Sequence, residues 1–196
     1  MNLYKIPAFE GDEGLLNVII ETPKGSRNKF DYDDRRGLFK LGGPLPAGME
    51  FPYHFGFVPS TLGGDGDPVD VLLLMDEPTY PGCLVEARLL GVIEAEQTEE
   101  GETTRNDRLV AVPDNSRVHH HVRQLEDLNE NLVAEIEHFF ISYNEVRGKQ
   151  FKAVGRGGVE RAREIVHEAE RRLARESPRA ISQQIAQAHM RRLHSS

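Results

Sequence analysis

The chain of 196 residues has very little cysteine and no long hydrophobic run. Its single cysteine, Cys83, cannot form a disulfide within the chain, which favours a reducing compartment and predicts a cytoplasmic location. No stretch reaches the roughly 18 apolar residues that a membrane-spanning helix requires. The first five residues, MNLYK, lack the pattern of a signal peptide. We therefore expect a protein that does not cross a membrane and does not depend on disulfides.

Positive charge is also in short supply. The 24 Lys and Arg residues are outnumbered by 32 Asp and Glu residues, which gives a formal net charge of −8. This balance argues against nucleic acid as the main partner. It does not argue against a phosphate substrate, because bound metal ions can reverse the local field. The length and the 38% of hydrophobic residues fit one globular domain with a substantial core.

The most informative stretch is an acidic loop that leads into an apolar run. Residues 65–75 have the sequence DGDPVDVLLLM, in which Asp65, Asp67 and Asp70 fall within six positions. Carboxylates this close repel one another unless protons or cations compensate them. The glycine permits a tight turn and the proline stiffens the loop. Hard cations such as Mg²⁺ prefer oxygen ligands. We predict a rigid metal-binding loop at the mouth of a buried strand over 69–75, although a plain solvated turn has a similar composition.

Two other kinds of metal site fit this loop poorly. A calcium loop between two helices needs oxygen ligands at alternating positions, glycine at the sixth position and glutamate at the twelfth. Counted from Asp65, the fifth residue is Val69, the sixth is Asp70 and the twelfth is Asp76. A zinc site is not supported, because the stretch contains no Cys or His.

The first half of the chain is predicted to consist mainly of β-strands joined by short turns, which indicates a barrel or closed sheet. Residues 51–59 carry four aromatic side chains but also two prolines and a glycine, so we expect an irregular wall there and not a central strand. A Gly- and Pro-rich loop is expected over 42–48. The expected strands are 15–22, 29–33, 38–41, 69–75, 84–96 with a break at Gly91, and 108–113.

The second half changes to a helical period. Residues 131–141 carry an amphipathic pattern, which predicts a helix that packs on the barrel. A short strand is expected over 150–154, a second helix over 159–176 with Ile165 and Val166 on its inner face, and a third helix over 180–193. We therefore predict an α+β, mainly β fold: a small closed β-barrel (OB-like) with flanking C-terminal helices over 1–176, and an extra helical tail over 177–196.

Residues 65–72, with the sequence DGDPVDVL, resemble the signature of the soluble family I inorganic pyrophosphatases. The resemblance extends over roughly residues 3–175 and implies a small β-barrel with flanking helices, hydrolysis of inorganic pyrophosphate to two phosphates, and several Mg²⁺ ions. Mn²⁺ or another divalent cation is an alternative, and a homo-oligomer is expected. The other matching segments are, in order, 18–23, Lys29, 37–39, 51–52, 90–92, 109–113, 138–140 and Tyr143.

The same resemblance assigns roles to the carboxylates. It implies that Asp65 and Asp70 bind metal, and that Glu21 binds another metal directly or through water. Asp67 would hold the nucleophilic water at the metal and accept its proton. Cations neutralise pyrophosphate and lower the pKa of bound water, whereas in-line phosphoryl transfer needs positioning more than covalent help. Taken alone, Glu21 at a strand end would be interpreted as a solvated carboxylate.

The resemblance also assigns substrate-binding cations and hydroxyls. Lys29 and Tyr143 would hold phosphate oxygens, although alone they would be interpreted as a solvated lysine and a half-buried helix residue. Arg108 stands where the family has a lysine, and it keeps the charge in a different geometry. The family's preceding aspartate ligand is Asn106 here, so Asp107 becomes the candidate ligand. Glu96, Glu99 and Glu100 are further candidates for an acidic ligand, since the loop is longer here.

The remaining differences from the family reduce the number of cationic and hydroxyl groups expected around the phosphates. They predict a slower enzyme, because each charged hydrogen bond to a transition state contributes on the order of 10²- to 10³-fold in rate. The alternatives are the same fold acting on another phosphoanhydride or organic phosphate, and a catalytically weak metal- or phosphate-binding homologue. The altered positions are Asp31 for a glutamate, Gly42 in the region of an expected arginine, Phe51 and Phe55 for two tyrosines, and Asn144 for a lysine. Nearby cations that would compensate are Arg27, Arg35, Arg36 and Lys40. The run of histidines at 119–121 is expected to be a solvated loop.

Overall fold

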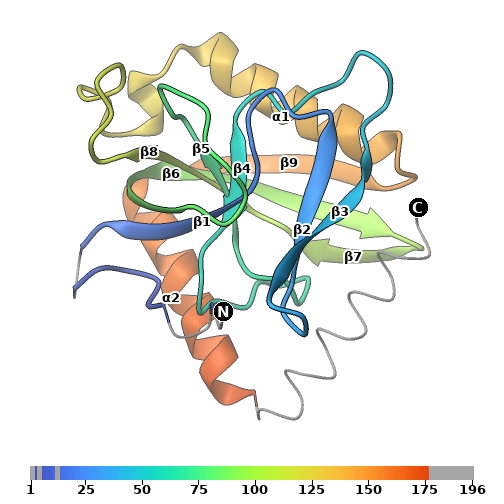
Figure 1. Cartoon of the computed structure of the whole chain (residues 1–196), viewed down its shortest axis with the longest axis horizontal. Helices are drawn as coiled ribbons and strands as arrows, with labels where there is room; N and C mark the ends of the chain where they lie inside the picture. The colour runs from blue at the N-terminus through green and yellow to red at the C-terminus, as the bar shows by residue number, and fades with distance from the viewer. Residues whose placement is uncertain (1–2, 4–5, 12–13, 177–196) are drawn as a thin grey trace.

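The computed structural model describes residues 3, 6–11 and 14–176 (Figure 1). The predicted tail over 177–196 lies outside these residues. The strands are β1 (Leu16–Thr22), β2 (Asn28–Asp33), β3 (Leu38–Pro44), β4 (His54–Phe57), β5 (Asp70–Leu73), β6 (Leu84–Glu99), β7 (Glu102–Arg105), β8 (Arg108–Pro113) and β9 (Gln150–Gly157). The helices are a short 3₁₀ turn, η2 (Leu125–Asp127), and the α-helices α1 (Glu130–Glu145) and α2 (Val159–Arg175).

Five strands close into a ring. Their order is β1-β4-β5-β8-β6, and β1 returns to pair with β6 through the register Leu16↔Ala87 to Ile19↔Leu84. Within the described sheet, β5 and β8 run parallel while the other neighbours are antiparallel. β7 and β9 also pair with β6, and β2 forms a separate hairpin with β3. The ring confirms the predicted closed sheet and the mainly β fold class.

The ring is held together by strands that are buried along their whole length. Every residue of β1 and of β8 is buried, including the apolar runs Val18–Ile20 and Leu109–Val112 and the polar residues Glu21 and Arg108. α2 covers one side with Ala162, Ile165, Val166 and Ala169. α1 covers the other with Val133, Ile136 and Phe140 (Figure 1). Full burial of one large apolar side chain stabilises by roughly 1.5–3 kcal/mol. No described helix is long and apolar enough to cross a membrane.

The expectation of an irregular wall over 51–59 was wrong. Residues 54–57 form β4, a central strand that pairs with both β1 and β5 and is buried throughout. The two prolines, Pro52 and Pro59, lie outside the paired residues and therefore remove no ladder hydrogen bond. A strand of only four residues fits between them.

Two strand boundaries also differ from those expected. β6 does not break at Gly91 but continues to Glu99, with a register shift between Leu89 and Gly91 on β8. A bulge absorbs the irregularity while the strand continues. β3 extends to Pro44, two residues beyond the start of the predicted loop at 42–48. β7, over Glu102–Arg105, was not predicted, because its sequence ETTR carries no apolar alternation.

Gly56 marks the closest approach of β4 to β1. A Cβ atom at this position would lie 2.2 Å from the carbonyl oxygen of Ile19. We expect Gly56→Ala to lower the free energy of unfolding by about 3 kcal/mol, because the clash is with backbone and forces the two strands apart. Chemical denaturation measures this change. Gly155→Ala is the matched control, since its Cβ would make an ordinary 3.5 Å contact with Glu94. Equal stability losses in both variants would contradict the argument.

Candidate active site

The acidic loop between β4 and β5 is a tight, internally bonded turn. Gly66 has φ = 86°, a conformation that glycine adopts without strain. The Asp67 amide donates to Oδ1 of Asp65 at 3.1 Å, and the Asp67 carbonyl accepts from the Gly63 amide at 2.6 Å. Thr61 Oγ1 accepts from the amide of Val69 at 3.0 Å. The loop is therefore fixed by hydrogen bonds from its backbone amides to nearby side-chain and backbone oxygens, and it delivers Asp70 to the first position of β5.

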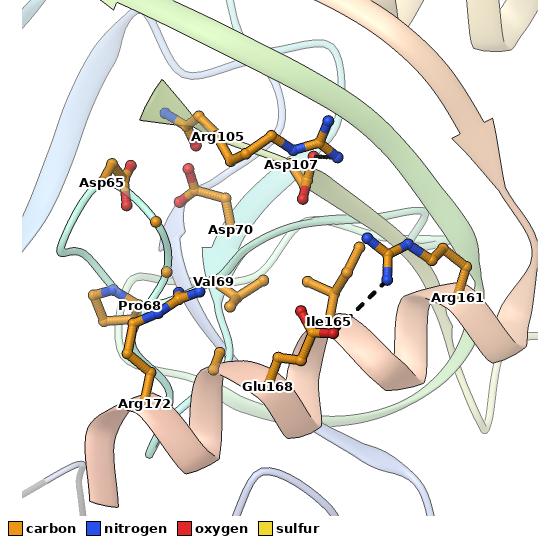
Figure 2. Close-up of a pocket in the computed structure, with 14 residues that line it drawn as sticks. Asp65, Pro68, Val69, Asp70, Arg105, Asp107, Arg161, Ile165, Glu168 and Arg172 are labelled. Atoms are coloured by element: carbon orange, nitrogen blue, oxygen red, sulfur yellow. Dashed lines mark ion pairs between the residues drawn. The ribbon is translucent and has the colours of Figure 1, made fainter. Parts of the chain in front are cut away.

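α2 anchors the same loop from outside. The amide of Leu62 donates to the carbonyl of Ala169 at 3.2 Å, and Arg172 Nη1 donates to the carbonyl of Leu62 at 2.8 Å. Between the loop and the helix lies a cavity with charged side chains from three stretches of the chain, 63–70, 105–107 and 161–172 (Figure 2). Its charged lining residues are Asp65, Asp70, Arg105, Asp107, Arg161, Glu168 and Arg172.

Three carboxylates crowd the loop. Removal from water, together with the negative charges of Asp67 and Asp70, raises the pKa of Asp65 from 3.8 to about 7. A cation near these oxygens would relieve the crowding, so the donor set fits a hard divalent ion. Across the described residues, however, no three Asp, Glu, His or Cys side chains already converge on one point as metal ligands do.

The raised pKa of Asp65 makes metal-free stability depend on pH. The unfolded chain releases this proton near pH 4 and the folded chain only near pH 7, so stability falls as pH rises through that interval. We expect metal-free Asp65→Asn to melt roughly 4 °C or more above the wild type at about pH 8. The gap should close towards about pH 4. Thermal melts in chelator across this range measure it, and parallel curves would contradict the expectation.

A second charged group lies on β1 and β2. Lys29 Nζ is 2.9 Å from Glu21 Oε2, 3.1 Å from Asp31 Oδ1 and 2.8 Å from the carbonyl oxygen of Phe30. Glu21 Oε1 also accepts from the amide of Tyr32 at 2.8 Å. Lys29 is only 8% exposed and Glu21 7%, so neither is the solvated surface side chain that its position alone would indicate. This geometry brings two predicted site residues together.

A third group joins β5 to β8. Arg108 Nη1 lies 2.5 Å from Asp70 Oδ2, and it also donates to the side-chain oxygen of Asn106. Asn106 Nδ2 donates onward to Gln97 Oε1 at 3.2 Å. The ring of Phe55 is near both this group and the previous one, with its centroid 5.9 Å from the Arg108 guanidinium and 4.8 Å from Lys29 Nζ. The two cations predicted to bind substrate therefore both lie within 5.9 Å of the centroid of one aromatic ring.

The other predicted residues lie around these groups. Asp107 Oδ1 accepts from the amide of Ala95 at 2.9 Å and is 2.8 Å from Arg105 Nη2, while burial raises the pKa of Asp107. Tyr143 is half-buried and stacks on Phe139, with ring centroids 5.7 Å apart.

Four further residues named from the sequence lie away from these groups or have other partners. Asn144 is buried and donates to the carbonyl of Phe140 at 2.8 Å, so its amide serves the helix. Glu99, one candidate acidic ligand, is 2.9 Å from Lys149 Nζ. His120 and His121 are exposed in a turn, as expected for a solvated loop. The pairing of Gln97 with Asn106 was missed, because it depends on the register of the β6–β7 hairpin.

The sequence profile described as inorganic pyrophosphatase matches residues 18–174. The chain belongs to the inorganic pyrophosphatase family. An inorganic pyrophosphatase of Nostoc sp. is 36% identical over 169 residues, which cover 86% of this chain and 97% of the relative. The crystal structure of the inorganic pyrophosphatase from Thermus thermophilus superposes with a TM-score of 0.81 at 33% identity, covering 89% and 99% of the two chains. That from Neisseria gonorrhoeae gives 0.80 at 31% identity, covering 89% and 100%.

Inorganic pyrophosphatases are hydrolases that convert pyrophosphate to phosphate, and the family depends on divalent metal ions. Family membership and fold, both expected from the acidic octad and its surroundings, are thus confirmed. The roles of individual residues remain predictions, because family membership and fold do not test what each side chain does.

Proposed function

We propose that this chain hydrolyses inorganic pyrophosphate to two phosphate ions at the acidic loop. One observation carries the proposal: buried Arg108 pairs with Asp70 of the three-carboxylate loop, and both Arg108 and the buried Lys29 lie against the ring of Phe55. A substrate with four phosphate charges needs both kinds of group. Carboxylates hold the metal ions that neutralise it, and fixed cations orient its oxygens.

The donor set favours Mg²⁺, with Mn²⁺ as the alternative, because the loop offers only hard oxygen ligands. Asp65, Asp67 and Asp70 are the proposed ligands, with Glu21 and Asp107 at the margins of the site. When bound, the cations neutralise the diphosphate and lower the pKa of water.

The chain's own residues perform the remaining steps. Asp67 accepts the proton of the attacking water at a carboxylate oxygen. Lys29 and Arg108 hold phosphate oxygens through charged hydrogen bonds, and the Tyr143 hydroxyl donates a hydrogen bond to a phosphate oxygen. The hydrogen bonds of the Asp67 amide and carbonyl hold its backbone in place during the reaction.

The rings of Phe51 and Phe55 bear on the competing proposal of an organic phosphate substrate. They stand in place of two tyrosines of the family pocket, so two hydroxyl groups are missing. If the rings were exposed, they would offer an apolar surface to the organic part of a substrate. Phe51 is 2% and Phe55 5% exposed, and their centroids lie 5.7 Å apart within the core. Side chains packed in this way offer little surface to a ligand, which favours pyrophosphate over an organic phosphate.

The proposed context is that of a cytoplasmic enzyme with a small-molecule substrate and no nucleic acid or membrane partner. A homo-oligomer is proposed from the family resemblance. Light scattering on the full chain measures the oligomeric state, and a monomer at micromolar concentration would contradict this part.

Phosphate release from pyrophosphate at saturating Mg²⁺ tests the main proposal. The same assay on nucleoside triphosphates, nucleoside diphosphates and phosphomonoesters compares the candidate substrates. We expect kcat/KM for pyrophosphate to exceed that for every organic phosphate by at least about 10². An organic phosphate would share the phosphate contacts, but its organic part would find no pocket that stabilises the transition state. Faster turnover of an organic phosphate would favour the alternative substrate. Metal and phosphate binding without turnover would identify a binding protein.

A further inference from the structure

Arg108 and Asp70 are direct neighbours across the parallel strands β5 and β8. Their Cα positions are paired in register, and the guanidinium Nη1 lies 2.5 Å from the carboxylate Oδ2. The Arg108 side chain is 5% exposed and that of Asp70 17%, so water screens the pair poorly. A carboxylate bonded in this way has less of its charge available for a metal ion.

The guanidinium is held in place on several sides. The side-chain oxygen of Asn106 accepts from the same Nη1. The rings of Phe140 and Phe151 lie 5.0 Å and 5.5 Å from its central carbon. Gln97 supports Asn106 through a 3.2 Å hydrogen bond. The neutral pair of Gln97 and Asn106 thus lies beside the charged pair of Arg108 and Asp70. Together these contacts hold the Arg108 guanidinium at the acidic loop.

Arg108 nevertheless retains a free donor. Its Nε is buried and has no hydrogen-bond acceptor among the described residues. A buried donor of this kind is costly, because it has lost its water. The guanidinium fork matches phosphate oxygens, which can accept two parallel N–H bonds. A phosphate near Arg108 would therefore compete with Asp70 for the same cation.

We propose that Arg108 and a divalent cation compete for the carboxylate of Asp70, and that phosphate anions relieve this competition by drawing the guanidinium to themselves. The anion thereby completes the metal site. Without anion, Arg108 neutralises Asp70 and repels a cation beside it. With anion, the oxygen of Asp70 becomes available to the metal. This inference rests on the proposed function only in taking the acidic loop as the metal site.

Reciprocity follows from the competition. If phosphate raises the affinity for the metal, the metal must raise the affinity for phosphate by the same factor. Direct contact between metal and phosphate produces coupling too, but that part does not depend on Arg108. The quantity to measure is therefore the part of the coupling between metal and phosphate binding that is lost when the Arg108 guanidinium is removed.

Mn²⁺ binding, followed by the electron paramagnetic resonance signal of free Mn²⁺, tests the proposal without turnover. Titrations are run with and without saturating inorganic phosphate on the wild type and on Arg108→Met, which fills a similar volume without charge. We expect phosphate to lower the wild-type Kd for Mn²⁺ at least about tenfold. In Arg108→Met we expect the phosphate-free Kd to be about five- to tenfold lower than in the wild type, with less than about threefold further change on adding phosphate.

Arg161→Met is the matched control. Arg161 lines the cavity beside the acidic loop and pairs with two other carboxylates, Glu94 at 3.2 Å and Glu164 at 3.1 Å. We expect this variant to lose one charge near the site and to keep the wild-type coupling within about twofold. An equal tightening of Mn²⁺ binding in both variants would show a general charge effect and overturn the proposal.

Other outcomes are equally decisive. Wild-type protein without phosphate coupling, or Arg108→Met that binds Mn²⁺ no more tightly than wild type, overturns the competition. Thermal melts check folding, and Arg108→Gln replaces the Met variant if that one melts early. Pyrophosphate hydrolysis by the wild type is measured separately. Hydrolysis without the Arg108 effect rejects this inference alone, whereas the Arg108 effect without hydrolysis rejects the proposed reaction alone.

Discussion

Asp67→Asn is expected to lower kcat on pyrophosphate by about 10²- to 10⁴-fold. The amide cannot accept the proton of the attacking water, and it is a weaker metal ligand than a carboxylate. Two hydrogen bonds of the loop use the backbone amide and carbonyl of Asp67 and remain in this variant. Because the amide side chain also has nearly the size of the carboxylate, we expect a melting temperature within about 2 °C of the wild type. Initial rates at saturating Mg²⁺ and thermal melts measure both effects.

Asp114→Asn supplies the control for this result. It makes the same chemical change at an exposed carboxylate that pairs with Arg88 at 3.2 Å. Its kcat should stay within about twofold of wild type, since surface ion pairs contribute little. Near-normal turnover by Asp67→Asn would refute the base assignment. A large loss in both variants would point to net charge and not to a specific proton acceptor.

Lys29→Met is expected to lose both activity and stability. Its ammonium lies within 3.1 Å of Glu21 and Asp31, whose side chains are 9% and 14% exposed. Removing the cation leaves two poorly solvated carboxylates that repel each other. We expect the free energy of unfolding to fall by about 3–5 kcal/mol, as when one partner of a buried ion pair is removed. We expect kcat to fall on the order of 10²- to 10³-fold, as when a charged donor to the reacting phosphate is lost.

A second substitution separates the two effects of Lys29→Met. Adding Glu21→Gln removes one of the uncompensated carboxylates, so the double variant should recover part of the lost stability. Its activity should not recover, because the phosphate-binding cation is still absent. Urea denaturation and steady-state kinetics on the three variants measure this. Recovery of turnover together with stability would mean that Lys29 serves the fold and not the substrate.

The sequence predicts best those features that consecutive residues encode. The apolar runs of β1 and β8 and the amphipathic period of α2 correspond to elements of the structure. β4 was missed because only four paired residues lie between prolines, too few for a periodic signal. The bulge at Gly91 was read as a break, since a glycine in a strand has the same sequence signature in both cases.

The candidate site shows the same division. The acidic loop was predicted because its three aspartates lie within six residues. The link from Gln97 through Asn106 and Arg108 to Asp70 joins three strands, so it depends on hairpin length and strand register. The position of Phe55 close to both Lys29 and Arg108 depended on recognising β4 as a strand. Contacts of this kind arise from tertiary packing, which local sequence patterns do not reveal.

Closure of the strand ring has a consequence for folding kinetics. The pairing of β1 with β6 and of β5 with β8 joins segments far apart in the chain, so loop entropy must be overcome before these contacts form. Asp70 meets Arg108 only through the second of these pairings. Refolding chains should therefore regain helix before they regain a competent site, and recovery of turnover after dilution from denaturant should report the slow, non-local step.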